Sequence, residues 1–335
     1  MRWEGRRALV TGGASFIGSH LVDALVARGA VVRVVDDLSS GVRENLEPHL
    51  SSGRVELVEA DLRAALDAVQ GQSVVFHLAA AHGGRGYVDL HQAECATNLA
   101  LDGALFRACR DAGVDKIVYA SSGCVYPNFR QTDPGEVVYL REDMVGPPYD
   151  ADNLYGWAKL MGELTLRAWC AEWGMKAASC RYFTVYGSRG HENHAVLAMI
   201  ARGLVRQDPF EVWGTGEQIR NWTHVSDIVS GTLLCAERID DGTAVNLGTM
   251  ERTRVADAVA QVIRYFGYAP DLAFRPDMPT GPLNRVADNA LARELLGWEP
   301  RVRFADGLAA TADWYAATHD PTKVRESLGR RLTER

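Results

Sequence analysis

Several features that would place the chain in a particular class are missing from its sequence. None of its six cysteines forms a CxxC pair or lies at metal-ligand spacing from a histidine, so no zinc or dithiol site is expected. No apolar run approaches the roughly 20 residues that span a bilayer, and the first residues leave no room for a signal peptide. We therefore expect a cytoplasmic protein with reduced thiols, no metal and no membrane contact.

Clusters of basic residues are also lacking. The 335 residues include 36 lysines and arginines against 43 aspartates and glutamates, which gives a net charge of −7. Because a nucleic-acid backbone is held by clustered cations, we expect no nucleic-acid partner. An anionic ligand of this chain must be held locally, by backbone amides and a few arginines.

Short β-branched runs alternate with helical patterns in the first half of the chain. Continuous apolar strands separated by helices indicate a parallel sheet that is covered on both faces. The sequence thus predicts an α/β fold with a Rossmann doubly wound sheet and ligands at the carboxyl ends of the strands. The expected strands are residues 7–11, 31–36, 55–60, 74–79, 116–121 and 178–183, with helices at 18–28, 98–112 and 155–173 among others.

The alternation changes after residue 185, where prolines and glycines become frequent and the helical patterns shorten. Residues 244–247 read as one more buried strand, so the chain is expected to return to the sheet at about residues 225–248. The predicted units are a dinucleotide-binding domain over residues 1–185 and a smaller substrate-binding lobe over residues 186–224 and 249–335.

A glycine-rich turn at residues 11–18 joins the first strand to the first helix. Such a turn lets backbone amides and the helix N-terminus approach a pyrophosphate. Asp36 ends the second strand about 20 residues further on, where an acidic residue hydrogen-bonds the adenosine ribose. Since a carboxylate would repel a 2′-phosphate, the pattern favours NAD over NADP. The alternative is a plain tight turn beside a solvated aspartate.

The turn resembles that of the extended short-chain dehydrogenase/reductases, the nucleotide-sugar epimerase and dehydratase group, whose pattern is GxxGxxG. Gly12 and Gly18 match this pattern, and Ser15 replaces the middle glycine with a hydroxyl that could donate to phosphate. The resemblance also implies cofactor contacts along this turn and at the ends of later strands. These are Phe16, Ile17, Asp61, Leu62, Leu78, Ala79, Ala80 and Asn98.

A YxxxK motif places Tyr155 and Lys159 on one face of a predicted helix. A neighbouring ammonium and a positive nicotinamide lower the pKa of a phenol, so Tyr155 could remove a hydroxyl proton while hydride leaves the same carbon for NAD. Both residues therefore count among the cofactor contacts as well. Ser122 falls where the resembling family keeps its catalytic serine, which can bridge the substrate oxygen and Tyr155. The alternative is a surface Tyr–Lys pair.

Cys124 distinguishes between reactions of the resembling group. GDP-mannose 3,5-epimerases place a cysteine there as an acid/base, whereas UDP-galactose-type 4-epimerases usually have a small hydroxyl residue. The 3,5-epimerases also share a YPxFxQ run and a GGxG loop, matched here at residues 126–131 and 83–86. Oxidation at C4 acidifies the protons at C3 and C5, which a thiol can remove or return. The alternative is that Cys124 is a small buried hydrophobe.

The resemblance is incomplete after the sixth strand. The 3,5-epimerases supply a lysine as the partner of the cysteine, but residues 186–191 contain none. His191 or His194 could replace it, because histidine titrates near neutrality; a solvated loop histidine is the alternative. Thr184 stands where the family usually has a substrate-binding asparagine.

Two arginines match positions at which the family holds the pyrophosphate of its substrate. Arg220 and Arg285 are these candidates, since a planar guanidinium suits bidentate phosphate contact; surface salt bridges are the alternative. Gly84 and Arg85 of the GGxG loop, with Ser122 and Thr184, complete the expected substrate contacts.

The leading hypothesis from these motifs is an NAD-dependent nucleotide-sugar epimerase, an isomerase that oxidises C4 transiently. It favours a GDP-mannose 3,5-epimerase-like enzyme, meaning a GDP-hexose 3,5- or 5-epimerase, with a UDP-sugar 4-epimerase as the alternative. Two further alternatives rank below these: a nucleotide-sugar dehydratase or dehydrogenase, and a non-catalytic NAD-binding module. The expected partners are a nucleotide-diphosphate sugar and a second copy of the chain, which the apolar helices at 98–112 and 155–173 would bind.

Overall fold

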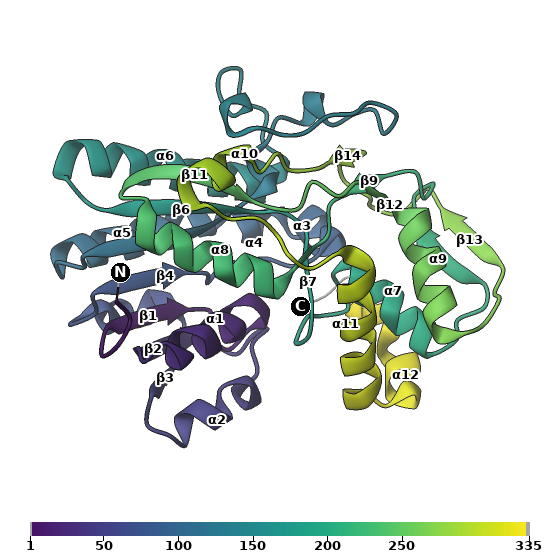
Figure 1. The fold of residues 1–335 in the computed structure, drawn as a ribbon, viewed down its shortest axis with the longest axis horizontal. Coiled ribbons are helices and arrows are strands. Elements are labelled where there is room, and N and C mark those ends of the chain that lie inside the picture. Colours follow the sequence, from purple (N-terminus) through teal and green to yellow (C-terminus); the bar gives the residue numbers. More distant parts are fainter. Residues whose placement is uncertain (1, 333–335) are drawn as a thin grey trace.

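A seven-stranded sheet forms the centre of the larger of the two parts of the molecule (Figure 1). The computed structural model describes residues 2–332, so residues 1 and 333–335, at the outer ends of the two predicted units, lie outside the described residues. The strands of the sheet are β1 (Arg7–Thr11), β2 (Val31–Asp36), β3 (Val55–Glu59), β4 (Val74–His77), β5 (Lys116–Ser122), β6 (Ala177–Tyr182) and β11 (Asp241–Leu247).

The strand order is β11-β6-β5-β4-β1-β2-β3, and every pairing is parallel. The chain therefore runs outward from β1 in one direction and then, from β4, in the other. This confirms the predicted doubly wound Rossmann sheet, whose ligand crevice lies where the strand order reverses, between β1 and β4.

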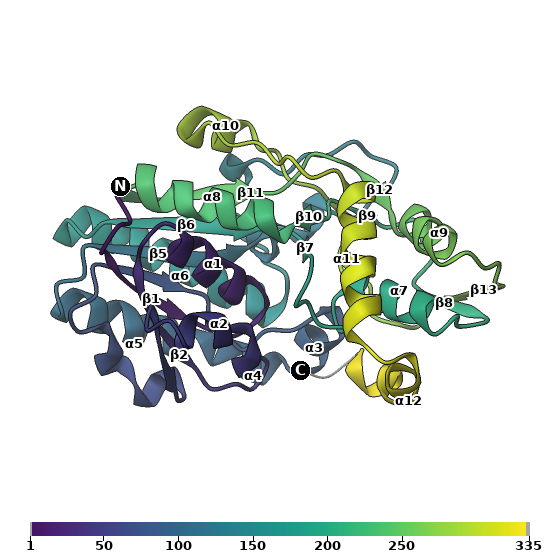
Figure 2. The same ribbon diagram turned by 60° about the horizontal axis from the view of Figure 1, so that its bottom comes forward.

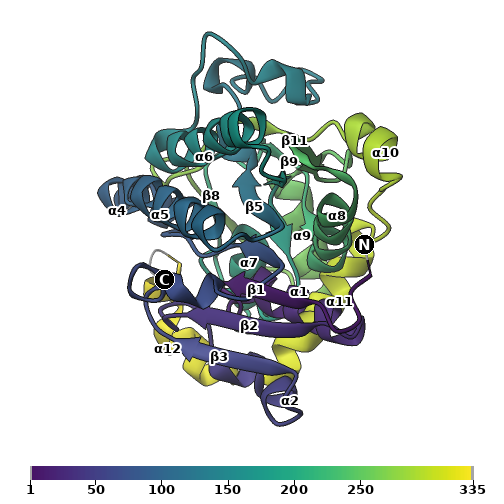
Figure 3. The same cartoon turned by 90° about the vertical axis from the view of Figure 1, so that its left-hand side faces the viewer.

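Successive side chains of each strand pack into different cores, because they point to opposite faces of the sheet. Val10 and Val34 belong to a core with one group of helices, and Leu9 and Val35 to a core with the other. Figure 3 shows the two helical layers on either side of the sheet. The first layer contains α1 (Phe16–Ala27), α8 (Val225–Arg238) and α10 (Ala290–Leu296), and the second α4 (Gln92–Ala96), α5 (Asn98–Asp111) and α6 (Asn153–Trp173).

Strand β4 ends at His77, two residues before the predicted end at Ala79. The Leu78 amide donates to both the carbonyl and the hydroxyl of Thr11 at 3.2 Å, and the Ala79 amide donates to the hydroxyl alone at 3.1 Å. The chain consequently turns away from β1 at the crevice. Helix α6 starts at Asn153, two residues earlier than predicted, because the Asn153 side chain accepts a hydrogen bond from the Tyr155 amide at 3.0 Å.

The rest of the chain forms a lobe beyond the carboxyl ends of the strands, with its own apolar core (Figure 2). Strand β11 also comes from the second half of the sequence, but it belongs to the main sheet, where it pairs with β6. No helix within residues 2–332 has the length and apolarity that a membrane span requires. The main elements of the lobe are α7 (Ala195–Leu204), β8 (Phe210–Trp213), α9 (Val255–Phe266), β13 (Leu272–Arg275), α11 (Phe304–Thr318) and α12 (Pro321–Arg331).

Short elements connect these parts, and several of them line the crevice. They are η1 (Arg43–Asn45), α2 (Glu47–Leu50), η2 (Leu62–Ala64), η3 (Leu66–Val69), α3 (Arg85–Leu90), η4 (Gly123–Val125), η5 (Asn128–Arg130), η6 (Glu142–Met144), β7 (Val185–Tyr186), β9 (Ile219–Arg220), β10 (Thr223–His224), β12 (Thr253–Arg254) and β14 (Asn284–Arg285).

Candidate active site

The glycine turn after β1 is packed too tightly for side chains at its two matching glycines. Gly12 has φ +70°, and a Cβ on Gly18 would lie 2.1 Å from the Gly12 carbonyl oxygen. The backbone of the turn and the N-terminus of α1 therefore face the crevice without intervening side chains, as the binding of a pyrophosphate requires. The Ser15 hydroxyl donates to the Gly12 carbonyl at 2.9 Å and lines the crevice, where its contact with a phosphate stays a prediction.

Asp36 closes β2 at the opening of the same crevice. Its two carboxylate oxygens accept from the amides of Ala14 and Leu38, each at 2.9 Å. The carboxylate is therefore held in a fixed orientation at the end of β2, where an acidic residue hydrogen-bonds a ribose. The structure thus provides a cradle that fits a dinucleotide.

The predicted cofactor contacts come together in two adjoining cavities. The side chain of Asn98 holds the backbone after β4 in place, because its amide group exchanges two hydrogen bonds with the backbone of Ala81, at 2.7 and 3.0 Å. One cavity is lined by Gly12, Ser15, Asp36, Asp61, Leu62, Leu78, Ala79, Ala80 and Asn98, and the other by Ser15, Phe16, Ile17, Gly18, Leu78, Ala80, Tyr155 and Lys159.

Ser122, Tyr155 and Lys159 meet where β5 ends beside α6. Both Tyr155 and Lys159 are buried, and the Lys159 ammonium lies 5.8 Å from the centroid of the Tyr155 ring. Burial raises the pKa of Tyr155 well above its ordinary value, and a hydrogen bond with Ser122 acts in the opposite direction. Use of this phenol as a base therefore requires additional positive charge next to it.

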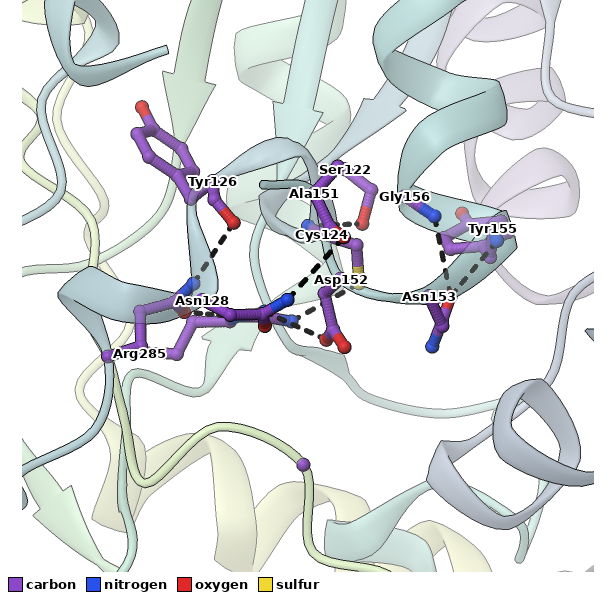
Figure 4. Close-up of polar contacts among 12 residues, drawn as sticks. Ser122, Cys124, Tyr126, Asn128, Ala151, Asp152, Asn153, Tyr155, Gly156 and Arg285 are labelled. Carbon is purple, nitrogen blue, oxygen red and sulfur yellow. Dashed lines mark hydrogen bonds and ion pairs between the residues drawn. The ribbon is translucent and has the colours of Figure 1, made fainter. Parts of the chain in front are cut away.

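Cys124 lies on η4, two residues after Ser122, and its sulfur faces Arg285 (Figure 4). The Arg285 Nη1 donates to the Cys124 Sγ at 3.2 Å, Nη2 donates to Asp152 at 2.9 Å, and Nε donates to Gln131 at 2.8 Å. The arginine that the sequence assigned to pyrophosphate thus contacts the candidate acid/base, and it lines the same cavity. A guanidinium held by Asp152 and Gln131 fixes the position of the sulfur to which it donates.

Asp152 was missed by the sequence analysis although it directly precedes α6. Its carboxylate also accepts from the Arg85 Nη1 at 2.7 Å, and Arg85 pairs with Asp89 as well. Arg220 donates to the carbonyls of Ile219 and Thr280.

Positive charge exceeds negative charge in this part of the cavity. Burial and the charges of Arg285 and Arg85 lower the pKa of Arg220. Three guanidiniums thus face the two carboxylates of Asp152 and Asp89, which leaves room for an anionic ligand.

Histidines border the cavity on the side of the second lobe. His191 lines the same cavity as Cys124 and Tyr155. The ring of His82 stacks on the ring of Tyr155 at a centroid distance of 4.8 Å and lies 5.6 Å from His194. Burial and the neighbouring His191 lower the pKa of His194 to about 4, so this second candidate is neutral at pH 7. Sequence reasoning did not single out His82.

Two of the predicted substrate contacts also line this cavity, Gly84 and Thr184. A Cβ on Gly84 would lie 1.5 Å from the carbonyl oxygen of Asn193. The glycine therefore lets the start of α3 touch the loop that carries the histidines, and its role is close packing. The Thr184 carbonyl accepts from the Thr223 amide at 2.9 Å, which leaves the Thr184 side chain at the cavity wall.

The chain is similar over most of its length to curated enzymes. It is 33% identical over 317 residues to UDP-glucose 4-epimerase of Mycolicibacterium smegmatis, which covers 92% of this chain and 98% of the relative. It is 30% identical over 321 residues to GDP-mannose 3,5-epimerase 1 of Oryza sativa subsp. japonica, covering 93% and 82%.

Solved structures share the fold as well. That of MoeE5 in complex with UDP-glucuronic acid and NAD superimposes with a TM-score of 0.80 at 30% identity, covering 93% of this chain and all of the other. The family model described as the NAD dependent epimerase/dehydratase family matches residues 8–248. The chain belongs to this NAD-dependent epimerase/dehydratase family, and NAD is its cofactor.

Proposed function

We propose that the chain is a nucleotide-sugar epimerase that oxidises C4 of the sugar transiently, and that it acts on a GDP-hexose at C5 or at both C3 and C5. The observation that carries this proposal is the thiol of Cys124, which lines the same cavity as Ser122, Tyr155 and Lys159. Similarity to GDP-mannose 3,5-epimerase 1 of Oryza sativa supports it. A simple 4-epimerase needs no such group, because C4 is inverted by hydride alone.

The glycine turn, Asp36 and the ends of β3 and β4 would hold NAD. Bound there, NAD supplies a hydride acceptor and a positive charge on its nicotinamide. That charge, together with the ammonium of Lys159, opposes the effect of burial on Tyr155. The phenol then takes the proton of the C4 hydroxyl, while the Ser122 hydroxyl holds the same oxygen.

Inversion at C3 or C5 requires a proton to leave one face of the ring and return on the other. The C4 ketone makes the neighbouring C–H bonds acidic. The Cys124 sulfur, oriented by Arg285, serves one face. His191 is our candidate for the other, because it lines the cavity on the side of the second lobe. This division gives the histidine the part that a lysine plays in the resembling 3,5-epimerases.

The test of this proposal is solvent exchange in deuterated water with a panel of GDP-, UDP-, dTDP- and CDP-sugars. We expect turnover of a GDP-hexose with deuterium incorporated at C5, or at both C3 and C5, which NMR of the product locates. Turnover of a sugar nucleotide with no deuterium at carbon would contradict the proposal.

A UDP-sugar 4-epimerase is the second candidate. Two observations favour it: the 33% identity to UDP-glucose 4-epimerase of Mycolicibacterium smegmatis, and the fold shared with MoeE5, which was solved with UDP-glucuronic acid. In that case the panel would show inversion at C4 of a UDP-sugar without exchange of any carbon-bound proton.

Removing Arg220 should weaken the binding of the substrate. An arginine–phosphate hydrogen bond contributes about 1.5–3 kcal/mol, so Arg220→Met should raise KM and the Kd of the free nucleoside diphosphate roughly 10- to 100-fold. We expect kcat to change much less, because a phosphate contact holds the substrate and the transition state equally well. Arg254→Met is the control, since this exposed arginine pairs with Asp257 at the surface. Equal Kd values for the two variants would contradict the assignment.

We also propose that the chain forms a homodimer through α5 and α6. Leu154, Trp157 and Met161 lie on one face of α6 and are 43%, 39% and 44% exposed, and Leu99 on α5 is 49% exposed. Trp157→Glu should therefore give a monomer in light scattering, while Leu272→Glu, at an exposed site of the second lobe, should leave the mass at that of the dimer. A monomeric wild type would refute the proposal.

A further inference from the structure

A buried chain of hydrogen bonds runs from the crevice toward the catalytic helix. The Thr11 hydroxyl accepts from the amides of Leu78 and Ala79 and lies 2.8 Å from the His77 Nδ1. Burial lowers the pKa of His77, so its ring is neutral at pH 7 and carries one proton. Since the Asp102 carboxylate can only accept, that proton lies on Nε2 and is donated to Asp102 at 2.9 Å, and Nδ1 accepts from the Thr11 hydroxyl.

Asp102, on α5, is only 2% exposed and accepts from two side chains. Its second oxygen takes the Tyr119 hydroxyl proton at 2.5 Å. The other side of the same tyrosine faces the catalytic helix, where the Lys159 ammonium lies 4.7 Å from the ring centroid. Gly162 makes room for this arrangement, because a Cβ there would lie 2.5 Å from the Tyr119 hydroxyl oxygen.

A buried carboxylate is costly unless it is paired or hydrogen-bonded. Burial raises the pKa of Asp102, but the hydrogen bond from His77 and the charge of Lys159 outweigh that effect, so the pKa is lowered. Burial lowers the pKa of Lys159 in turn, and the charge of Asp102 opposes this shift. The two groups thus stabilise each other's charge, and each of them also contacts Tyr119.

We propose that Asp102 is a positioning residue for the proton-transfer site, which holds the Lys159 ammonium charged beside Tyr155 and ties it through His77 and Thr11 to the cofactor crevice. The proposal rests on the function assigned above to Tyr155 and Lys159. It assigns a task to a buried carboxylate that touches neither substrate nor cofactor. The charge on Lys159 then depends on a residue of a neighbouring helix.

The effect of removing the carboxylate has a definite sign. Without Asp102, burial acts on Lys159 unopposed, so its pKa falls and the ammonium loses its proton at a lower pH. An opposite charge at this range shifts a pKa by about one to three units. The titratable groups that act on Lys159 or lie beside it are Asp102 (α5), His77 (β4), Tyr119 (β5) and Tyr155 (α6). One step further out, Cys95 (α4) and Cys124 (η4) act on Tyr155, and Glu163 (α6) acts on Tyr119.

The chain suits a direct measurement, because it has only four lysines: Lys116, Lys159, Lys176 and Lys323. NMR of NAD-loaded protein with ¹³Cε-labelled lysine can follow each one, and the resonance missing from Lys159→Arg identifies Lys159. In Asp102→Asn, which keeps the size of the side chain, we expect Lys159 to titrate at least about one pH unit lower. The other three lysines should not move. A Lys159 that titrates at the wild-type pH would overturn the proposal.

Turnover gives a second, separate readout. In Asp102→Asn the pH at which kcat falls on the basic side should move down with Lys159, and Asp102→Glu should restore it in part. Asp227→Asn, at another buried carboxylate on α8, should leave that limb unchanged. A wild type that turns over no sugar nucleotide would refute the proposed function alone, whereas an unshifted Lys159 or an unshifted basic limb would refute the role of Asp102. Retained NAD affinity establishes that each variant is folded.

Discussion

Tyr155→Phe should lower kcat by roughly 10²–10⁴-fold, the range that a positioned acid/base contributes, with little change in NAD affinity. The substitution removes only the hydroxyl that takes the C4 proton. The buried ring would still stack on His82 and pack beside Lys159, so the cavity should keep its shape. Steady-state turnover and NAD binding by fluorescence measure the two quantities.

The matched control for this variant is Tyr265→Phe. Tyr265 is an exposed tyrosine of the second lobe that hydrogen-bonds Asp313, and its loss should not change kcat. If Tyr155→Phe retained more than about a tenth of the wild-type kcat, the phenol would not be the base.

Cys124→Ser should slow the exchange of the C3 or C5 proton with solvent by roughly 10²–10⁴-fold. Hydride transfer at C4 should continue, because the Ser122, Tyr155 and Lys159 side chains are unchanged. A serine hydroxyl has the size to accept the hydrogen bond of Arg285 but is a far weaker acid than a thiol. The two rates are separated by following deuterium uptake by NMR and NADH formation by absorbance in one turnover.

Cys170→Ser provides the comparison, since Cys170 lies near the other end of α6, where it is partly buried against the apolar core between α5, α6 and the sheet. In this variant the C3 or C5 proton should exchange with solvent at the wild-type rate. Unchanged exchange in Cys124→Ser would mean that the thiol only fills space, and the reaction would then be sought among 4-epimerisations.

Local signals in the sequence predicted the sheet and the cofactor crevice well. The glycine turn and Asp36 depend on short-range backbone requirements: a tight turn, a helix N-terminus and the end of a strand. The strand and helix periodicities likewise needed no knowledge of distant contacts. The ends of elements were less predictable, because side chains such as Asn153 and Thr11 capture backbone amides there.

Contacts between distant segments could not be predicted in the same way. Arg285 and Cys124 are 161 residues apart in the chain, and nothing in either neighbourhood indicates their hydrogen bond. Asp152 likewise pairs with Arg85 of its own unit, 67 residues away, and with Arg285 of the second lobe, 133 residues away. The buried position of Asp102 is equally hidden, because one aspartate in an amphipathic helix usually faces water.

A nucleotide hexose with deuterium at C4 tests the central claim most directly, that Tyr155 takes a proton while C4 gives its hydride to NAD and receives it back. Turnover in ordinary water should be slower than with the undeuterated sugar, and the product should keep its deuterium at C4. Loss of that deuterium to water, or an equal rate for both sugars together with no NADH in a single turnover, would contradict the mechanism.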